Sequence, residues 1–255
     1  MENVGFEREG MRLLRVARDD AITLRLVGSV AFALRCPVHA HLQERLGRAY
    51  ADIDLVGMGK EAERTQRLFA DEGYDEDAGV YVESQGSRLV FRHPETRLHI
   101  DVFLDRMEFC HTIDLRDRLL VDEQTVPLAE LLMTKMQIVE INEKDLIDTI
   151  ILLLEHPLGD NDRETINMEL IARVCATDWG WWRTLTMNLE KARGMALSYA
   201  QLTDAEKRRL ADQVDKALER VGREPKSFGW RVRARVGDRR KWYTDVGELT
   251  PIEEV

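Results

Sequence analysis

The chain has 255 residues, of which 44% are hydrophobic and 33% are charged, and its net charge is −10. This length can bury a core without disulfides, and the negative charge excludes a protein that coats nucleic acid by bulk electrostatic attraction. No apolar run is long enough to cross a membrane and the amino-terminal sequence lacks a secretory signal, so we expect a cytoplasmic protein. The three cysteines, Cys36, Cys110 and Cys175, are far apart, and we expect them to be reduced thiols.

The first half of the chain alternates between strand and helix patterns. Gly28 and Ser29 interrupt the first strand, and Ser29 is expected to cap the helix that follows. The segment 93–96 is typical of a hairpin turn. In chain order, periodicity predicts a helix over 6–19, a strand over 22–27, a helix over 30–35, a strand over 52–56, a polar helix, and β-rich runs over 80–82, 88–92 and 97–104.

The periodicity becomes helical after Pro127. Helices are predicted over residues 128–141, 144–155, 163–176, 179–198 and 204–221. The predicted fold class is therefore α+β, with a mixed-sheet domain followed by a helical domain. The expected domains are residues 1–126, 127–222 and a basic carboxy-terminal arm, 223–255.

Three aspartates lie on the predicted strands. Asp52 and Asp54 share one strand face, because alternate residues of a strand point the same way. Asp101 interrupts an otherwise apolar strand, where an acid needs a partner. If the two strands are neighbours, three carboxylates meet and could hold Mg²⁺ or Mn²⁺, with Asp101 as the candidate base. The alternative is that Asp52 and Asp54 are solvated acids of an edge strand.

A Gly-Ser turn precedes these acids. Gly28 and Ser29 open a helix, where free backbone N–H groups and the Ser29 hydroxyl can hold a triphosphate. The order of strand, Gly-Ser, helix, Asp-x-Asp and a later single Asp resembles the DNA polymerase β-type nucleotidyltransferase superfamily. The resemblance is closest to the AbiEii-type toxin and abortive-infection branch, because Arg48 stands four residues before Asp52 and a later helical stretch carries a Lys and a Lys-Asp pair.

That later stretch contains Lys135, Lys144 and Asp145 and resembles the third motif of the family. The resemblance spans roughly residues 22–155. It implies that Lys135 and Lys144 contact the triphosphate, that Asp145 helps to organise the site and that Arg48 belongs to the nucleotide site. From the residues alone, Lys135 could instead be a solvated helix residue, and Lys144 and Asp145 could be the exposed first turn of a helix.

Two further groups of side chains leave alternatives open. His99 stands two residues before Asp101 and could approach a metal or substrate, or could be a satisfied histidine inside the sheet. Trp179, Trp181 and Trp182 could stack on bases, but aromatics at the start of an amphipathic helix more often fill the core.

The carboxy-terminal stretch is basic. Between Arg223 and Tyr243 the local charge is +6. Arg231, Arg233 and Arg235 alternate with small or apolar residues, so on a strand they would share one face and could contact RNA. The alternative is a solvated surface, or one paired with the acidic remainder of the protein.

The combined patterns favour a metal-dependent nucleotidyltransferase that moves a nucleoside monophosphate from an NTP to an acceptor hydroxyl. Asp52, Asp54, Asp101 and Lys135 are the predicted catalytic residues. Resemblance to the toxin branch implies the 3′ end of tRNA as the acceptor and an antitoxin protein as a partner. The alternatives are an aminoglycoside-type enzyme, an enzyme that nucleotidylates proteins, and a nucleotide- or RNA-binding module of the same fold without turnover.

Overall fold

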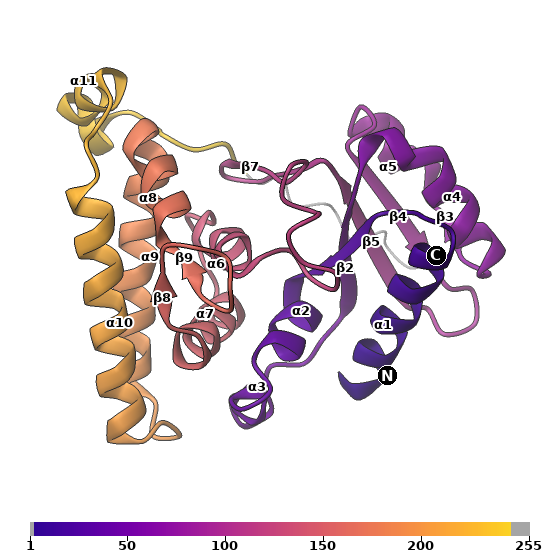
Figure 1. The fold of residues 1–255 in the computed structure, drawn as a ribbon, viewed down its shortest axis with the longest axis horizontal. Coiled ribbons are helices and arrows are strands. Elements are labelled where there is room, and N and C mark those ends of the chain that lie inside the picture. Colours follow the sequence, from indigo (N-terminus) through magenta and orange to yellow (C-terminus); the bar gives the residue numbers. More distant parts are fainter. Residues whose placement is uncertain (1–2, 246–255) are drawn as a thin grey trace.

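The computed structural model describes residues 3–245 (Figure 1). Its first half contains α1 (Asn3–Asp19), β1 (Leu24–Val27), α2 (Gly28–Arg35), α3 (Ala40–Arg45), β2 (Asp52–Gly57), η1 (Gly59–Glu61), α4 (Ala62–Asp71), β3 (Asp75–Glu76), α5 (Ala78–Glu83), β4 (Arg88–Arg92), β5 (His99–Leu104), β6 (Arg106–Glu108) and β7 (Thr112–Asp114). Its second half contains α6 (Leu128–Met136), α7 (Glu143–Glu155), β8 (Leu158–Gly159), β9 (Ile166–Asn167), α8 (Met168–Thr177), α9 (Trp179–Ser198), α10 (Asp204–Arg223), α11 (Phe228–Val236) and η2 (Gly237–Arg239).

A five-stranded mixed sheet organises the first half. Its strand order is β1-β2-β5-β4-β3. β2 and β5 are parallel, whereas the other neighbouring pairs are antiparallel. The parallel pair lies at the centre of the sheet, so the strands that carry the three aspartates are direct neighbours.

One face of this sheet is covered by α1 and α4. Gly10 of α1 lies so close to Leu26 of β1 that an added Cβ would be 3.1 Å from a Leu26 methyl carbon. Phe69 of α4 stacks on Phe91 of β4, with ring centroids 4.2 Å apart. Because successive residues of a strand point to opposite faces, Asp52, Asp54 and Asp101 lie on the other face.

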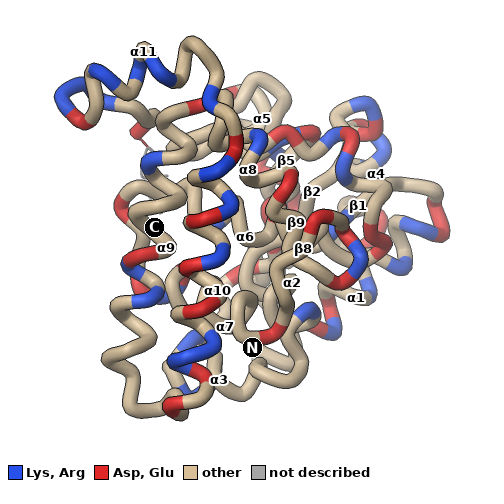
Figure 2. Tube along the Cα trace, turned by 60° about the vertical axis from the view of Figure 1, so that its left-hand side comes forward, with Lys and Arg blue, Asp and Glu red and all other residues tan. Residues whose placement is uncertain are grey.

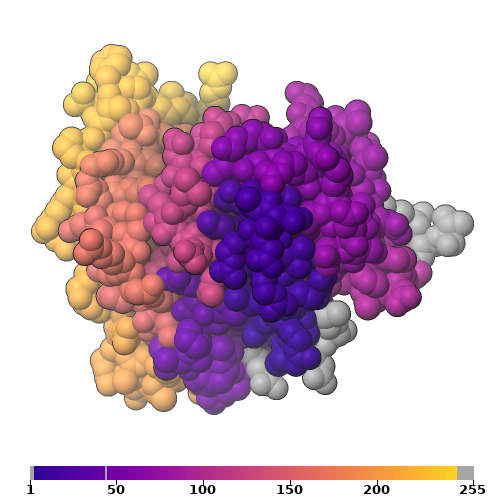
Figure 3. All heavy atoms as spheres, turned by 45° about the vertical axis from the view of Figure 1, so that its right-hand side comes forward, coloured from indigo at the N-terminus to yellow at the C-terminus, as the bar shows by residue number. Residues whose placement is uncertain are grey.

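The second half packs its helices against one another and against the first half. α9 contacts α6, α7, α8 and α10, while α2 contacts α6 and α7. The Asn188 amide of α9 donates to the carbonyls of Met136 and Ile138, and the Trp181 indole donates to the carbonyl of Thr112. In Figure 3, residues of the first half and the carboxy-terminal helices form a continuous surface on the face shown.

The predicted α+β class is confirmed, with the mixed sheet first and helices after it. The β4–β5 hairpin and the neighbouring aspartate strands are also as expected. Cys36, Cys110 and Cys175 are buried free thiols, as predicted. The predicted division into domains remains a prediction, and residues 246–255 of the arm lie outside the described residues. No helix within residues 3–245 combines the length and apolar character needed to cross a membrane.

Three local predictions are wrong. Residues 80–82 belong to helix α5, where the Asp77 carboxylate caps the first turn by accepting from the Gly79 N–H. Residues 231–235 belong to helix α11, which the Ser227 hydroxyl caps. Ser29 is not a cap, because α2 already begins at Gly28 after the N-cap Val27. In each case a local capping or turn geometry prevailed over an alternating pattern that predicted a strand, or over the propensity of serine.

Two predicted helices are shorter than expected at one end. The helix predicted to run to residue 141 ends at Met136, and the helix predicted from residue 163 begins at Met168. The second difference arises because Ile166 and Asn167 pair with Leu158 and Gly159 as a short parallel ladder. The Asn167 side chain then caps α8 by accepting from the Leu170 N–H.

Candidate functional site

Strand register brings the three aspartates together. Asp54 of β2 is directly opposite Asp101 of β5, and Asp52 is opposite His99. In a parallel pair, registered neighbours point to the same face. Asp101 is buried, with 5% of its surface exposed, whereas Asp52 and Asp54 are partly exposed. The arrangement therefore concentrates negative charge on one face of the central strands.

Gly28 closes one side of this charged region. Its φ of +68° lies in the left-handed region, and a Cβ built on it would be 1.9 Å from Asp54 Oδ2. A residue with a side chain would therefore have to displace the Asp54 carboxylate and also adopt a strained backbone. Glycine at this position lets the start of α2 approach Asp54 directly.

Burial and repulsion act together on Asp54. The pKa of the Asp54 carboxyl is raised well above its ordinary value, first by burial and then by the charges of Asp52 and Asp101. Lys135 and Arg88 act in the opposite direction without cancelling the effect. No described residue donates a hydrogen bond to the Asp52 or Asp54 carboxylate. The charged form of Asp54 is therefore undercompensated, and a cation would relieve the repulsion.

Arg88 holds the third carboxylate. Its Nε donates to Asp101 Oδ1 at 2.5 Å, and its Nη2 donates to Asp101 Oδ2 at 2.7 Å. The guanidinium carbon also lies 5.3 Å from the ring centroid of Phe103. His99 Nδ1 is 3.9 Å from Asp101 Oδ2. Both oxygens of Asp101 are therefore occupied by a two-point ion pair that the sequence analysis did not predict.

Lys135 extends from α6 to two acids of α7. Its Nζ is 2.7 Å from Asp145 Oδ1 and 3.1 Å from Asp148 Oδ2. Lys135 is 9% exposed and Asp148 is completely buried. The two carboxylates raise the pKa of Lys135 against the opposing effect of burial, so the side chain stays positively charged.

Arg48 forms a second ion pair with Asp148, one of the two acids that hold Lys135. Its Nη2 is 3.2 Å from Asp148 Oδ2, and Gln43 Nε2 donates to Asp148 Oδ1 at 3.1 Å. The Tyr50 hydroxyl in turn donates to Gln43 Oε1 at 2.6 Å. Arg48 is therefore linked to the candidate site only indirectly, because it pairs with Asp148, which in turn pairs with Lys135. The sequence analysis did not assign Asp148, although an acid in the apolar run of α7 is a signal that a buried partner exists.

A cavity of about 180 Å³ joins several of these groups. It is smaller than the roughly 300–1,000 Å³ of most small-molecule sites, so it can take only part of a nucleotide. Its aromatic side is formed by Phe103 and Phe109, whose rings meet edge to face with centroids 5.6 Å apart. The predicted site residues that line it are Gly28, Asp54, Lys135 and Asp145.

The remaining predicted nucleotide ligands lie outside this cavity. Ser29 is buried in the first turn of α2, and no described residue forms a hydrogen bond with its hydroxyl. Lys144 is exposed in the first turn of α7 and has no described partner. Arg48 is held by Asp148, as above. The structure thus places four of the nine predicted catalytic and nucleotide-binding residues around one cavity and leaves Lys144 in solvent.

The donor types fit a hard cation, but the carboxylates do not form a ready ligand cluster. Oxygen ligands select Mg²⁺ or Mn²⁺, and the carboxylates of Asp52 and of the undercompensated Asp54 provide them. However, within residues 3–245 no group of three His, Cys, Asp or Glu side chains is placed to hold a metal ion. Asp101 can become the third ligand only when Arg88 releases one of its oxygens.

In the basic arm, Arg233 packs against the protein, whereas Arg231 and Arg235 are exposed to solvent. Arg233 lies over the Trp179 ring at 4.5 Å and donates to the carbonyls of Gly237 and Arg240. Arg231 and Arg235 are one helical turn apart and exposed, so the three arginines do not share a face. The basic residues of α11 are visible in Figure 2.

The tryptophans at the start of α9 mainly fill the core. Trp179 and Trp181 are 5% and 3% exposed, and Trp181 stacks on His111. Trp182 is partly buried against Trp230. This burial supports the core interpretation over base stacking.

No protein-family model matches the chain, and no curated protein matches it.

The charge on Asp54 has a consequence for stability. The pKa of Asp54 is higher in the folded state than in the unfolded state. The charged carboxylate therefore lowers the free energy of unfolding, by an amount that grows as pH rises above the unfolded-state pKa and is complete above the folded-state pKa. In EDTA at pH 7, Asp54→Asn is therefore expected to have a higher free energy of unfolding in urea than the wild type. The difference should close below about pH 4, where the carboxyl is protonated in both states.

Asp160→Asn provides the control, because Asp160 is exposed and has no described partner. This variant should unfold like the wild type at every pH. If Asp54→Asn and the wild type have equal unfolding free energies at pH 7, the charge on Asp54 is compensated and the interpretation is wrong.

Proposed function

We propose that the protein is a nucleotidyltransferase that transfers a nucleoside monophosphate from an NTP to an acceptor hydroxyl. The observation that carries the proposal is the close approach of Gly28 to Asp54 beside Lys135, in one cavity and in the motif order of the polymerase β-type superfamily. This arrangement combines an undercompensated carboxylate, a positive helix start and a buried cation. It provides opposite charges for a triphosphate and for its counter-ion.

Lys135 is suited to hold a phosphate oxygen. An ammonium group has three N–H donors; Asp145 accepts one of them, and Asp148 forms an ion pair with the group at 3.1 Å. A donor that Asp145 does not use remains for a ligand in the cavity that Lys135 lines. The two acids and Arg48 fix the position of the ammonium group, so little reorganisation is needed when a phosphate binds.

The start of α2 supplies further donors. The first backbone N–H groups of a helix have no partner within the helix, and the helix dipole favours an anion there. Val27, at the N-cap position, has no side chain that can satisfy them. In the proposal, the N–H groups that follow Gly28, together with the Ser29 hydroxyl, hold the phosphates next to Asp54.

The proposed reaction is an in-line displacement. The acceptor oxygen bonds to the α-phosphorus, the bond from that phosphorus to the bridging oxygen of the β-phosphate breaks, and pyrophosphate leaves. Asp101 takes the proton of the acceptor hydroxyl once Arg88 has released one of its oxygens. A divalent cation held by Asp52 and Asp54, and by Asp101 after that release, would lower the pKa of the acceptor hydroxyl and neutralise charge on the phosphates.

The two-point Arg88–Asp101 pair favours a second candidate, a module of the same fold that binds a nucleotide without turnover. A side chain that occupies both oxygens of the proposed base would prevent proton transfer if it never moved. Nucleotide binding with no pyrophosphate release on any acceptor would support this candidate.

RNA is the proposed acceptor, with the 3′ end of tRNA as the specific candidate. Arg231 and Arg235 are exposed on α11, and no described residue forms a salt bridge with either. Free guanidinium groups attract phosphate backbones and repel a polycationic aminoglycoside. An antitoxin partner remains part of this proposal through the toxin branch that the motifs resemble.

The carboxylates can be tested by nucleotide transfer. The protein is incubated with labelled NTPs, Mg²⁺ and total RNA, beside Asp52→Asn, Asp101→Asn and the control Asp160→Asn. Each active-site variant is expected to lose about 10²-fold or more of the wild-type labelling rate, because it removes a cation ligand or the proton acceptor. Equal labelling by the wild type and Asp101→Asn would contradict the assigned role.

The basic helix can be tested by RNA affinity. The double variant Arg231→Glu/Arg235→Glu is expected to weaken tRNA binding by about tenfold or more and to reduce its salt dependence, because two phosphate contacts are lost. Arg208→Glu/Arg209→Glu is a matched control, since these adjacent arginines are exposed on α10. Similar losses in both double variants would show a nonspecific charge effect and remove α11 from the proposal.

A further inference from the structure

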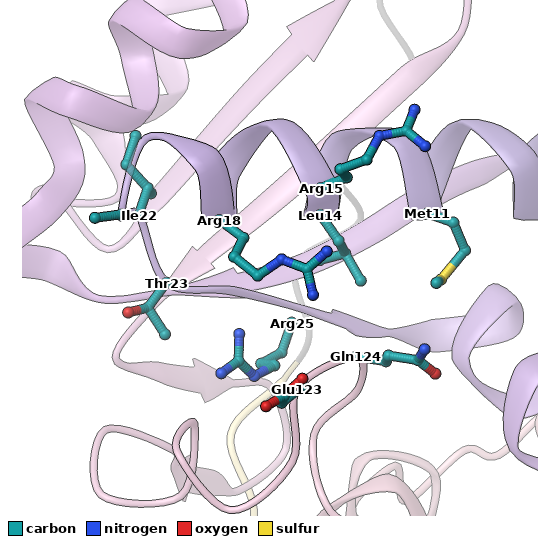
Figure 4. A pocket seen from close by; sticks show the side chains of 10 residues that line it. Met11, Leu14, Arg15, Arg18, Ile22, Thr23, Arg25, Glu123 and Gln124 are labelled. Carbon is teal, nitrogen blue, oxygen red and sulfur yellow. The ribbon is translucent and has the colours of Figure 1, made fainter.

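A second cavity lies away from the aspartates, at the opposite end of β1 from Gly28. Its volume is about 480 Å³, and it is bounded by the second half of α1, the start of β1 and residues 123–124 (Figure 4). This volume lies within the roughly 300–1,000 Å³ of most small-molecule sites. None of the proposed catalytic or nucleotide-binding residues lines it.

Two arginines approach this cavity from different elements. Arg18 comes from α1 and Arg25 from β1, and Figure 4 shows their side chains turned toward the same space, whereas Arg15 points away. Arg25 donates to the carbonyls of Leu24 and Asp122, which fixes its guanidinium group. No described carboxylate lies within ion-pair distance of Arg18 or Arg25.

The cavity therefore holds two arginines that form no direct ion pair with the described residues, and one of them, Arg25, is partly buried. Burial lowers the pKa of the Arg25 guanidinium, and the charges of Asp122 and Glu123 oppose this effect. A guanidinium group still keeps its proton at neutral pH, so the cost of burial remains until an anion enters. The planar fork of arginine is matched in shape to phosphate and carboxylate oxygens.

The remaining walls differ in chemistry. Leu14 is buried and forms an apolar wall together with Met11, whereas the buried Ile22 lines the opposite end of the cavity. Glu123 and Gln124 lie on the other side. The Glu123 carboxylate can accept hydrogen bonds from hydroxyl or amino groups, and the apolar wall can cover the face of a ring.

We propose that this cavity binds a mononucleotide, with its phosphate between Arg18 and Arg25 and its base against the wall formed by Met11 and Leu14. Glu123 accepts from the sugar hydroxyls or from an amino group of the base. A nucleotide combines the anionic group, the planar ring and the hydrogen-bond donors that these walls require. The site goes beyond the proposed transferase activity and does not depend on it.

The proposal is tested by calorimetry on the full chain in EDTA, with AMP, adenosine and inorganic phosphate as probes. AMP is expected to bind with a dissociation constant in the millimolar range or tighter, and adenosine and phosphate more weakly. Arg18→Glu should weaken AMP binding by at least about tenfold, because it replaces an attractive charge with a repulsive one. Arg8→Glu is the matched control, since Arg8 is also exposed on α1 but does not line the cavity.

Two further variants separate this site from the aspartate site. Arg25→Gln should also weaken AMP binding, and urea unfolding checks that its lost carbonyl contacts have not unfolded the chain. Asp54→Asn should leave AMP affinity unchanged. The proposal is overturned if no AMP binding is detected, if Arg18→Glu binds AMP like Arg8→Glu, if phosphate alone binds as tightly as AMP, or if Asp54→Asn removes the binding.

Discussion

The parallel register of β2 and β5 is the constraint on which the candidate site depends. It places Asp54 opposite Asp101, so the carboxylates cannot separate without shifting the central pair of the sheet. A shift by one residue would turn every apolar side chain of these strands to the wrong face, because the side-chain period of a strand is two. The buried residues Ile53, Leu55 and Ile100 therefore hold the acids together, although they take no part in the chemistry.

The helical half completes the site from the other side. Lys135 is carried by α6 and its two acidic partners by α7, while Arg48 and Gln43 reach Asp148 from the first half. Asp148 is completely buried, so its ion pairs are effective only while these elements remain packed. Removing one partner would leave a buried charge without compensation. The charged network thus links the packing of the two halves to the position of one ammonium group beside Asp54.

Periodicity and motif order predicted the parts of this fold that depend on local pattern. The α+β class, the β4–β5 hairpin and the shared strand face of Asp52 and Asp54 could be predicted because apolar alternation fixes strands and faces, whereas the pairing of β2 with β5 could only be stated as a condition. The side chains that pair with the site residues could not be predicted from these patterns. Arg88 meets Asp101 through the pairing of β4 with β5, and Arg48 meets Asp148 across 100 residues. In residues 231–235, arginines alternate with apolar residues as they would on a strand, although the segment is a capped helix that exposes Arg231 and Arg235 and packs Arg233 on Trp179.

The central claim is that Asp54, crowded by Asp52 and Asp101, takes its compensation from a divalent cation. The most direct test is a titration of the protein with Mn²⁺, in which free Mn²⁺ is followed by electron paramagnetic resonance. We expect the wild type and Asp160→Asn to bind Mn²⁺ with the same affinity, and Asp54→Asn to bind it at least about tenfold more weakly, because a carboxylate ligand is lost. Equal Mn²⁺ affinity in the wild type and Asp54→Asn would contradict the claim.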